Sequence, residues 1–531
     1  MRKWSTVIRS RPARPLTELQ RLHADAVVVG AGLGGLGAAG YLAREGYRVV
    51  VLEHHAVPGG YAHEFKRRGF RFDVALHALD GAGAGGWLNT MLDDLGVLGR
   101  VAFTRLDPFY TARFPDYEIT VPARLGDYLD RLKADFPDEA EHLDDLFTAT
   151  RRVAEDVGAY ARARAGGRRP APMEMVERYP AMAAAFSTDW GTFLARHIAD
   201  RRLRAVVSAL WGYLGLPPSK VSAGLFALVI DSYANGGAWY PVGGSQAMSR
   251  AIVQGIVERG GTVRFRDRVA RIETSEGRAA AVETERGLRV DARVVVSNAS
   301  PAATVDLAGR EHFDPAFLAS VDTDVPAMSN LVVYLGLDRD LAAEGWDHHE
   351  FFLSEGYDIE ADYAAARSGD FSKAGMVIAN YTKSDPGCAP VGKSVLVLLS
   401  LAPWGHADVW GTGGDLVDYS GNPRYVRVKR TAAGQLIDRA ERLIPGLRNS
   451  IIVEEIGTPL TNVRYGLSPA GSIYGREQTV ANMMNRRSPK TPIPNLLLAG
   501  AWVGGGGMSA ALNSGRTAAT IARGLLASGS A

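Results

Sequence analysis

Residues 25–60 read DAVVVGAGLGGLGAAGYLAREGYRVVVLEHHAVPGG, and this stretch decides the fold of the chain. A short apolar run at 26–29 stops at a glycine, and the pattern Gly30-x-Gly32-x-x-Gly35 follows at once. In a strand–turn–helix unit the first glycine permits the tight turn, the second lets backbone N–H groups approach a pyrophosphate, and the third lets the helix pack against its strand. The sequence therefore predicts a βαβ unit that binds a dinucleotide, with the pyrophosphate at the helix N-terminus.

The residues after these glycines complete the unit. Apolar side chains recur at helical spacing over 36–42, Gly46 ends the helix, and residues 48–52 form a second apolar strand. Glu53 follows, at the position where a carboxylate accepts hydrogen bonds from the ribose hydroxyls. A second glycine frame begins two residues later, too far from the end of the strand, so we favour the first frame and place Gly34 in the same cofactor-binding turn.

The sequence beyond Glu53 indicates which dinucleotide is bound, since NAD and FAD sites share the βαβ unit. The turn Pro58-Gly59-Gly60 places flexible backbone where a second, extended part of a cofactor would run. Residues 30–60 resemble the flavoproteins of the amine oxidase and phytoene desaturase superfamily. The resemblance implies FAD as the cofactor, with Gly59 and Gly60 beside it.

A second motif lies near the C-terminus. Residues 494–500 read PNLLLAG, a strand that ends on glycine, and a glycine run at 504–507 precedes a helix of small residues at 508–516. The superfamily carries such a strand, turn and helix against the flavin ring and ribityl chain. The resemblance therefore places five more residues at the cofactor, namely Gly500, Ala501, Gly507, Met508 and Ser509. Many members have an acidic residue at the position of Ala501, so this chain departs from the pattern there.

The composition is typical of a large soluble enzyme. The chain has 531 residues, enough for two or three domains, and its formal charge of +2 does not favour nucleic acid as a partner. The single cysteine, Cys388, excludes an intramolecular disulfide and fits the reducing cytoplasm. No apolar segment reaches the roughly 20 residues of a membrane-spanning helix. These features predict a cytoplasmic protein and leave its oligomeric state open.

Residues 1–24 form a basic N-terminal arm. Residues 1–23 contain six Lys or Arg against one Glu and lack the apolar core of a signal peptide. We interpret the segment as a flexible arm. The alternative is a peripheral membrane contact in which Trp4, Val7 and Ile8 enter the lipid surface.

The predicted fold class is α/β, with a discontinuous Rossmann-type FAD-binding domain, a mixed-sheet substrate domain and a helical lid. We assign residues 25–100, 239–300 and 456–531 to the FAD-binding domain. Charged helical patterns assign 101–238 to the helical lid and substrate region, with a linker at 166–170, and 301–455 remain for the substrate domain. The resemblance places Val269, in the middle segment, against the adenine.

Two further segments resemble one branch of the superfamily, which holds phytoene desaturases, carotenoid isomerases and retinol saturases. Residues 72–77, FDVALH, resemble the saturase pattern of a Phe-Asp pair followed by a histidine, and residues 457–475 resemble the same branch. These enzymes act on carbon–carbon double bonds of long apolar polyenes. The resemblance implies an FAD-dependent oxidoreductase that desaturates, isomerises or saturates a polyene or isoprenoid by hydride transfer at flavin N5.

The candidate catalytic residues are His77 and Tyr240. An imidazole can donate or accept a proton near neutral pH, although a packed histidine is the alternative reading of His77. We expect the substrate to contact a set of aromatic residues and glycines, namely Trp239, Tyr240, Gly243, Gly244 and Tyr465. No spacing of His, Cys, Asp or Glu is typical of a metal site, so no metal is predicted.

Two other functions remain open. Relatives of phytoene desaturase in bacterial natural-product pathways use reduced flavin to close a ring on a polyene tetramate or polyketide. Rab GDP-dissociation inhibitors resemble the superfamily in fold and carry prenylated partners without catalysis, but the complete motif from Gly30 to Glu53 argues against a carrier. Only one glycine motif lies between a strand and a helix, so a second domain for tightly bound NADPH is not expected, and transient binding of NAD(P)H stays open. His77 favours reduced flavin together with a proton donor.

Overall fold

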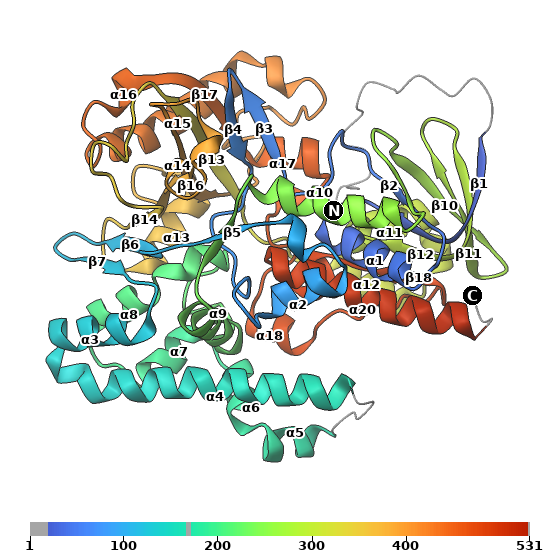
Figure 1. Cartoon of the computed structure of the whole chain (residues 1–531), viewed down its shortest axis with the longest axis horizontal. Helices are drawn as coiled ribbons and strands as arrows, with labels where there is room; N and C mark the ends of the chain where they lie inside the picture. The colour runs from blue at the N-terminus through green and yellow to red at the C-terminus, as the bar shows by residue number, and fades with distance from the viewer. Residues whose placement is uncertain (1–19, 166–170, 529–531) are drawn as a thin grey trace.

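The computed structural model of the chain describes residues 20–165 and 171–528. Figure 1 shows a sheet packed with helices on the right, a second sheet with helices at the upper left, and a layer of helices at the lower left. The predicted α/β class is confirmed, because two large sheets and a separate helical layer are present. Residues 1–19, which hold most of the predicted basic arm, and the predicted linker at 166–170 lie outside the described residues.

The first sheet is assembled from three segments that lie far apart in the sequence. Its order is β10-β11-β12-β1-β2-β9, with β18 beside β12. The parallel strands are β1 (Arg21–Val29), β2 (Val49–Leu52), β9 (Thr262–Arg264), β12 (Arg289–Ser297) and β18 (Leu496–Leu498), and the antiparallel ones are β10 (Val269–Ser275) and β11 (Arg278–Thr284). The carboxyl ends of the parallel strands therefore meet at one edge, where ligands of such sheets bind.

Strand β1 is buried on both of its faces. Ala26 and Val28 belong to the core that also contains α1 and α20, whereas Val27 and Val29 belong to the core on the opposite face of the sheet. That second core contains residues of α11 (Pro301–Ala308) and α12 (Pro315–Asp322), so these helices pack on the first sheet rather than in the substrate domain expected from residue 301. β1 also begins at Arg21, inside the predicted arm, because Arg21 pairs with Arg289 of β12.

Helices α1 (Leu33–Arg44) and α20 (Met508–Ala527) lie against each other beside this sheet (Figure 1). Their close approach depends on glycines. A Cβ atom at Gly515 would lie 2.1 Å from the Gly34 carbonyl oxygen, and one at Gly37 would lie 2.6 Å from the Leu512 carbonyl oxygen. No side chain fits at these positions, so the two helices are in backbone contact.

The second sheet is mixed, with the order β17-β13-β16-β15-β14-β6-β7. Its strands are β6 (Tyr110–Arg113), β7 (Glu118–Val121), β13 (Ser329–Leu337), β14 (Glu350–Leu353), β15 (Met376–Asn380), β16 (Ser394–Ala402) and β17 (Ile451–Gly457). Helix α15 (Pro423–Glu441) packs on one face. The hairpin of β6 and β7 belongs to this sheet because β6 pairs in parallel with β14. It comes from the segment 101–238, which we expected to be a helical lid.

The helical layer contains α3 (Leu125–Asp135), α4 (Ala140–Ala165), α5 (Pro172–Arg178), α6 (Pro180–Phe186), α7 (Trp190–Ala195), α8 (Arg201–Val207) and α9 (Ala223–Gly236). A 3-10 turn, η4 (Ala209–Tyr213), connects α8 to the centre of the molecule. Trp190 of α7 stacks on Phe226 of α9, with ring centroids 4.5 Å apart. Helix α9 is thereby held between the outer helices and the interior (Figure 1).

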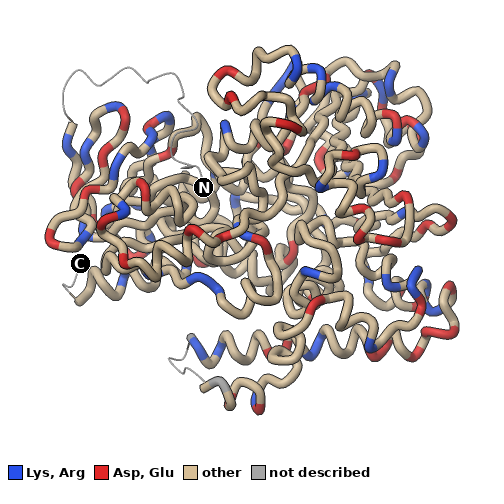
Figure 2. The backbone as a smooth tube through the Cα atoms, turned by 180° about the vertical axis from the view of Figure 1, so that it is seen from behind, with Lys and Arg blue, Asp and Glu red and all other residues tan. Residues whose placement is uncertain are grey.

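Charged residues of both signs are interspersed around the outside of the molecule. Figure 2 shows Lys and Arg next to Asp and Glu on most outer loops and helices, whereas the central tube is largely uncharged. Among the helices of residues 20–165 and 171–528, none has the length and apolar character needed to cross a bilayer.

The contact between α1 and α20 predicts a strong and local effect of one methyl group. Gly515→Ala should destabilise the protein by about 1–3 kcal/mol or more, the usual cost of overpacking, because its Cβ meets backbone. Gly524→Ala on the same helix is the control, since within the described part of the chain no atom lies within 4 Å of a Cβ built there. The control should be neutral or stabilising by up to about 1 kcal/mol through helix propensity. Urea unfolding of both variants measures the difference, and equal stabilities would show that the helices are not in close contact.

Candidate active site

A cavity of about 970 Å³ extends from the carboxyl edge of the first sheet to the second sheet and the helical layer. We call its two ends the dinucleotide limb and the apolar limb. The dinucleotide limb is lined by Gly30, Gly32, Gly34, Glu53, Gly59, Gly60, Val269, Asn298, Gly500, Ala501, Gly507, Met508 and Ser509. The apolar limb is lined by Trp211, Leu225, Leu228, Val229, Phe352, Met376, Val377, Leu399 and Leu401.

The predicted cofactor residues are thus brought together from both ends of the chain, with one exception. Gly35 does not line the cavity, because it packs inward and a Cβ there would lie 2.0 Å from the Gly30 carbonyl oxygen. Its role is the close packing of α1 on its strand. The remaining glycines form the wall itself.

Two helix N-termini open onto the dinucleotide limb. Helix α1 begins after Gly32 and α20 begins after Gly507, and neither N-terminus has a side-chain cap or an acidic residue in its first turn. The free N–H groups and the positive ends of both helix dipoles favour an anion. Gly507 has a positive φ of 102°, and no atom of the described residues lies within 4 Å of a Cβ built there, so its backbone faces open space. These features fit the diphosphate of a dinucleotide.

Glu53 stands at the end of β2 with its carboxylate fixed by backbone. Its Oε2 accepts a hydrogen bond from the Ala31 N–H at 2.6 Å, and its Oε1 accepts one from the His55 N–H at 2.6 Å. Burial raises the pKa of this carboxyl group, while the bonds from His55 and Ala31 lower it. The remaining lone pairs of Glu53 are available to ribose hydroxyls, which fits the adenosine half of FAD.

Asn298, which the sequence did not single out, lies at the centre of the glycine turn. Cβ atoms built at Gly32 and Gly34 would each come within 2.5 Å of its side chain, and one at Gly500 within 2.6 Å. Asn298 is the first residue after β12, so it stands at the carboxyl end of a parallel strand. That position was the available signal, because polar residues there face the ligand.

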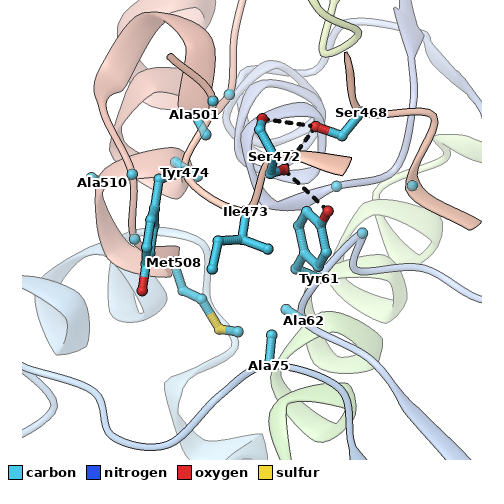
Figure 3. A pocket seen from close by; sticks show the side chains of 18 of the residues that line it. Tyr61, Ala62, Ala75, Ser468, Ser472, Ile473, Tyr474, Ala501, Met508 and Ala510 are labelled. Carbon is cyan, nitrogen blue, oxygen red and sulfur yellow. Dashed lines mark hydrogen bonds between the residues drawn. The ribbon is translucent and has the colours of Figure 1, made fainter. Parts of the chain in front are cut away.

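Small side chains line the part of the cavity drawn in Figure 3. Ala62 and Ala75 lie on one side and Ala501 and Ala510 on another, and the side chain of Met508 extends between them. The Tyr61 hydroxyl donates a hydrogen bond to the Ser472 carbonyl oxygen at 3.1 Å, which connects the two segments of the cavity wall that contain these residues. Walls made of alanines leave space for a flat ring system, which fits the isoalloxazine of a flavin.

The apolar limb is formed by α9 and the second sheet. Leu225, Leu228 and Val229 stand at positions i, i+3 and i+4 of α9 and line the cavity, while the other face of the helix packs on α4 and α7. Phe352 of β14 and Leu399 of β16 line the same limb. Such a wall favours an apolar ligand.

His77 lines the cavity and belongs to a buried polar cluster. Its Nδ1 lies 3.3 Å from the Tyr381 hydroxyl and 3.6 Å from Oε1 of Glu350, and its Nε2 has no hydrogen-bond partner among the described residues. Tyr381 donates its own proton to the Leu76 carbonyl oxygen at 2.7 Å. Burial lowers the pKa of His77 to about 3, with a smaller contribution from His349, so the imidazole is neutral at neutral pH.

Glu350, which the sequence did not single out, lies beside His77. It is fully buried at the start of β14, and the Tyr213 hydroxyl donates a hydrogen bond to its Oε2. Burial raises the pKa of this carboxyl to about 8, against the opposing effect of Tyr213. The available signal in the sequence was an acidic residue that begins the apolar strand Glu350–Leu353. Buried acids with perturbed pKa values are frequent at functional sites.

Four of the residues expected to contact substrate do not line the cavity, namely Trp239, Tyr240, Gly243 and Gly244. Strand β8 (Trp239–Pro241) instead pairs with β5 (Phe103–Arg105). In the turn after β8, the N–H of Gly243 donates a hydrogen bond to Asp385 and the N–H of Ser245 donates one to Asp73. The Tyr240 hydroxyl donates to Asp73 at 3.3 Å, which also removes Tyr240 from contact with the ligand space. Tyr465 does line the cavity, but beside His55 at the dinucleotide limb, with ring centroids 5.6 Å apart.

No group of three His, Cys, Asp or Glu side chains is placed to hold a metal ion within residues 20–165 and 171–528. The electropositive helix ends, the Glu53 carboxylate and the alanine-lined space together fit a flavin dinucleotide.

Comparison with known proteins agrees with this geometry. The model of the family described as flavin containing amine oxidoreductase matches residues 33–410. The all-trans-retinol 13,14-reductase of Danio rerio is 27% identical over 516 residues, which cover 90% of this chain and 82% of the relative. The chloroplastic prolycopene isomerase of Daucus carota is 25% identical over 470 residues, which cover 85% of this chain and 71% of the relative.

Solved structures share the fold. An oxidoreductase from Methanosarcina mazei aligns with a TM-score of 0.62 and 19% identity, covering 93% of this chain and 99% of that protein. The cyclohexylamine oxidase of Brevibacterium oxydans aligns with a TM-score of 0.61 and 17% identity, covering 94% and 99%. The resemblance inferred from the two glycine motifs is confirmed, and the chain belongs to the flavin containing amine oxidoreductase family as an FAD-dependent oxidoreductase.

Proposed function

We propose that this oxidoreductase acts on carbon–carbon double bonds of a long apolar polyene or isoprenoid. The observation that carries the proposal is the continuity of the cavity, in which an apolar limb walled by α9 and the second sheet opens directly into the dinucleotide limb. A long conjugated chain could lie in the apolar limb with one double bond at the flavin. The retinol reductase and the prolycopene isomerase, which are named for reactions of such compounds, support the proposal.

A bound flavin supplies the hydride acceptor or donor for such a reaction. The protein itself positions the substrate, excludes water from the reacting bond and transfers a proton. Leu225, Leu228 and Val229 hold the apolar substrate and exclude water from the reacting bond. His77 stands at the cavity wall with an unpaired Nε2, where it can give a proton to a substrate carbon or take one from it.

The reaction that we favour is saturation. Adding hydrogen to an alkene requires one hydride and one proton, and the site offers a proton-transferring side chain at the wall of the cavity. Isomerisation would use the same residues without net consumption of electrons, and desaturation would reverse the proton transfer. Electrons for saturation would come from an external donor such as transiently bound NAD(P)H.

Flavin binding should depend on Glu53. Each hydrogen bond to a charged group contributes about 1.5–3 kcal/mol, so loss of one ribose contact in Glu53→Ala should raise the Kd for FAD by about 10- to 100-fold. Isothermal titration of the deflavinated protein measures the effect. Glu45→Ala, on the exposed end of α1, is the matched control and should bind FAD normally.

Because Glu53 also accepts bonds from Ala31 and His55, the variant must be compared with the wild type in urea unfolding without flavin. Unchanged FAD affinity in Glu53→Ala would remove the ribose contact. A purified wild-type protein without colour, unable to bind added FAD, would instead favour a carrier without catalysis.

The apolar limb should be open to a long chain and closed by one large side chain. Val229→Trp should weaken polyene binding by about 10-fold or more, since overpacking costs about 1–3 kcal/mol, and should leave flavin content unchanged. Val257→Trp on α10 (Ser245–Glu258), where the valine is 52% exposed, is the control. Displacement of bound all-trans-retinol or a carotenoid, followed by absorbance, gives the affinities. Equal binding by both variants would place the substrate elsewhere.

The direction of electron flow can be determined by comparing two anaerobic incubations, one with chemically reduced protein and one with oxidised protein and a quinone. Polyenes mixed with chemically reduced protein should be saturated, and His77→Ala should slow this reaction by about 10²-fold, the lower range for general acid catalysis. Product formation only by oxidised protein with a quinone would make the enzyme a desaturase. A cyclised product in the reduced arm would identify the reductive cyclisation of a polyene tetramate or polyketide instead.

A further inference from the structure

We propose that Glu350 holds the proton that His77 delivers to the substrate, so that the two side chains act as one buried proton relay. The inference rests on the proposed function, because it assigns the source of the proton for the same reaction. Glu350 does not line the cavity, whereas His77 does, so Glu350 would act through His77 and would not touch the substrate.

The hydrogen bonds around Glu350 leave one of its oxygens for His77. The Tyr213 hydroxyl donates to Oε2, but Oε1 is buried and has no hydrogen-bond partner among the described residues. His77 Nδ1 is 3.6 Å from this oxygen. That separation is slightly longer than a hydrogen bond, as is common in catalytic pairs that tighten only when substrate is bound.

Other ionisable groups surround Glu350, and three of the tyrosines among them donate their protons to backbone oxygens. Those that face it are Tyr110, Tyr213, Tyr233, Tyr381, Tyr474 and His77. The hydroxyls of Tyr233, Tyr381 and Tyr474 donate to the backbone oxygens of Ala78, Leu76 and Gly212. The neighbouring His349 is also engaged, with its two ring nitrogens at Ser384 and the His77 carbonyl.

No lysine or arginine within residues 20–165 and 171–528 forms an ion pair with Glu350. A buried carboxylate without a cation is costly, so the group keeps its proton instead. The raised pKa of Glu350 and the lowered pKa of His77 describe the same resting state, a neutral acid beside a neutral imidazole. Burial is the larger cause of both shifts.

Asp73 shows what a purely structural buried carboxyl looks like in this protein. Its two oxygens accept hydrogen bonds from the Ser245 N–H, the Ser245 hydroxyl, the Leu76 N–H and the Tyr240 hydroxyl. Among the described residues Glu350 has only the bond from Tyr213, and an unpaired oxygen in such a position calls for a function. The imidazole of His77, whose buried Nε2 has no hydrogen-bond partner among the described residues, lies between Glu350 and the cavity.

The proton transfer balances in one turnover of a saturation. A bound reduced flavin would supply the hydride for one alkene carbon, and the other carbon would then hold the electron pair that accepts the proton. The His77 Nε2–H bond breaks as the C–H bond forms, and the Glu350 O–H bond breaks as Nδ1–H forms. The imidazole is neutral before and after, and the new carboxylate keeps its hydrogen bond from Tyr213 until solvent returns a proton.

Infrared spectroscopy tests the pair without any substrate. The flavin-loaded wild type should show the carbonyl stretch of a protonated carboxylic acid that titrates near pH 8 and is absent in Glu350→Gln. His77→Ala should shift that titration. Asp362→Asn, which removes another buried carboxyl that does not line the cavity, should leave the band in place. Absence of the band, or a titration that ignores His77, would overturn the relay.

The pH dependence of turnover tests the role of the pair in catalysis. The acid must be protonated to act, so saturation by the wild type should be fast below about pH 8 and should fall as the pH rises through that value. Glu350→Gln should be slower by about 10²-fold and lack this descending limb, with normal FAD affinity. Tyr213→Phe should move the limb to higher pH, because the Tyr213 hydrogen bond lowers the pKa of Glu350.

A Glu350→Gln enzyme with the full rate and an unchanged descending limb would overturn the relay even if polyenes are substrates. If the infrared band titrates and responds to His77 while no polyene is turned over in either redox state, the proton-sharing pair stands and the proposed function fails. The two failures are therefore distinguishable.

Discussion

The backbone contact between α1 and α20 is the constraint on which the rest of the site depends. Gly34, Gly37 and Gly515 bring the two helices together, and their N-termini then open onto one cavity although they lie more than 450 residues apart in the sequence. The field of a helix end acts only within about its first turn. Both ends must therefore be close to the same anion, and a side chain at Gly37 or Gly515 would separate them.

The lining of the cavity changes from polar at the dinucleotide limb to apolar at the other limb, so a cofactor and an apolar substrate can be bound side by side. The dinucleotide limb is formed by backbone N–H groups and the Glu53 carboxylate, whereas the apolar limb is formed by aliphatic and aromatic side chains. The same dryness that suits an apolar substrate makes an isolated charge costly. Glu350 and His77 lie near this dry interior, so their ionisation is shifted by burial rather than by salt bridges.

The sequence predicted the cofactor end better than the substrate end, for a physical reason. Local backbone geometry requires the glycines from Gly30 to Gly60 and the start of a helix at Met508. Their spacing in the sequence therefore predicts the structure without knowledge of long-range contacts. Placing Tyr240 requires knowing that β8 pairs with β5 and turns its side chain toward Asp73, a long-range pairing without a local pattern. Glu350 lies beside His77 because β14 is an interior strand of the second sheet, between β15 and β6, and this placement also has no local pattern in the sequence.

The most direct measurement of the central claim is a crystal structure of the flavin-loaded protein with a bound polyene or a redox-inert analogue. The account predicts the flavin ring beside Ala75 and Met508, the diphosphate between the N-termini of α1 and α20, and the polyene along Leu225, Leu228 and Val229 with a double bond next to His77. A flavin ring open to water through a polar cleft, or a ligand bound outside the apolar limb, would contradict it.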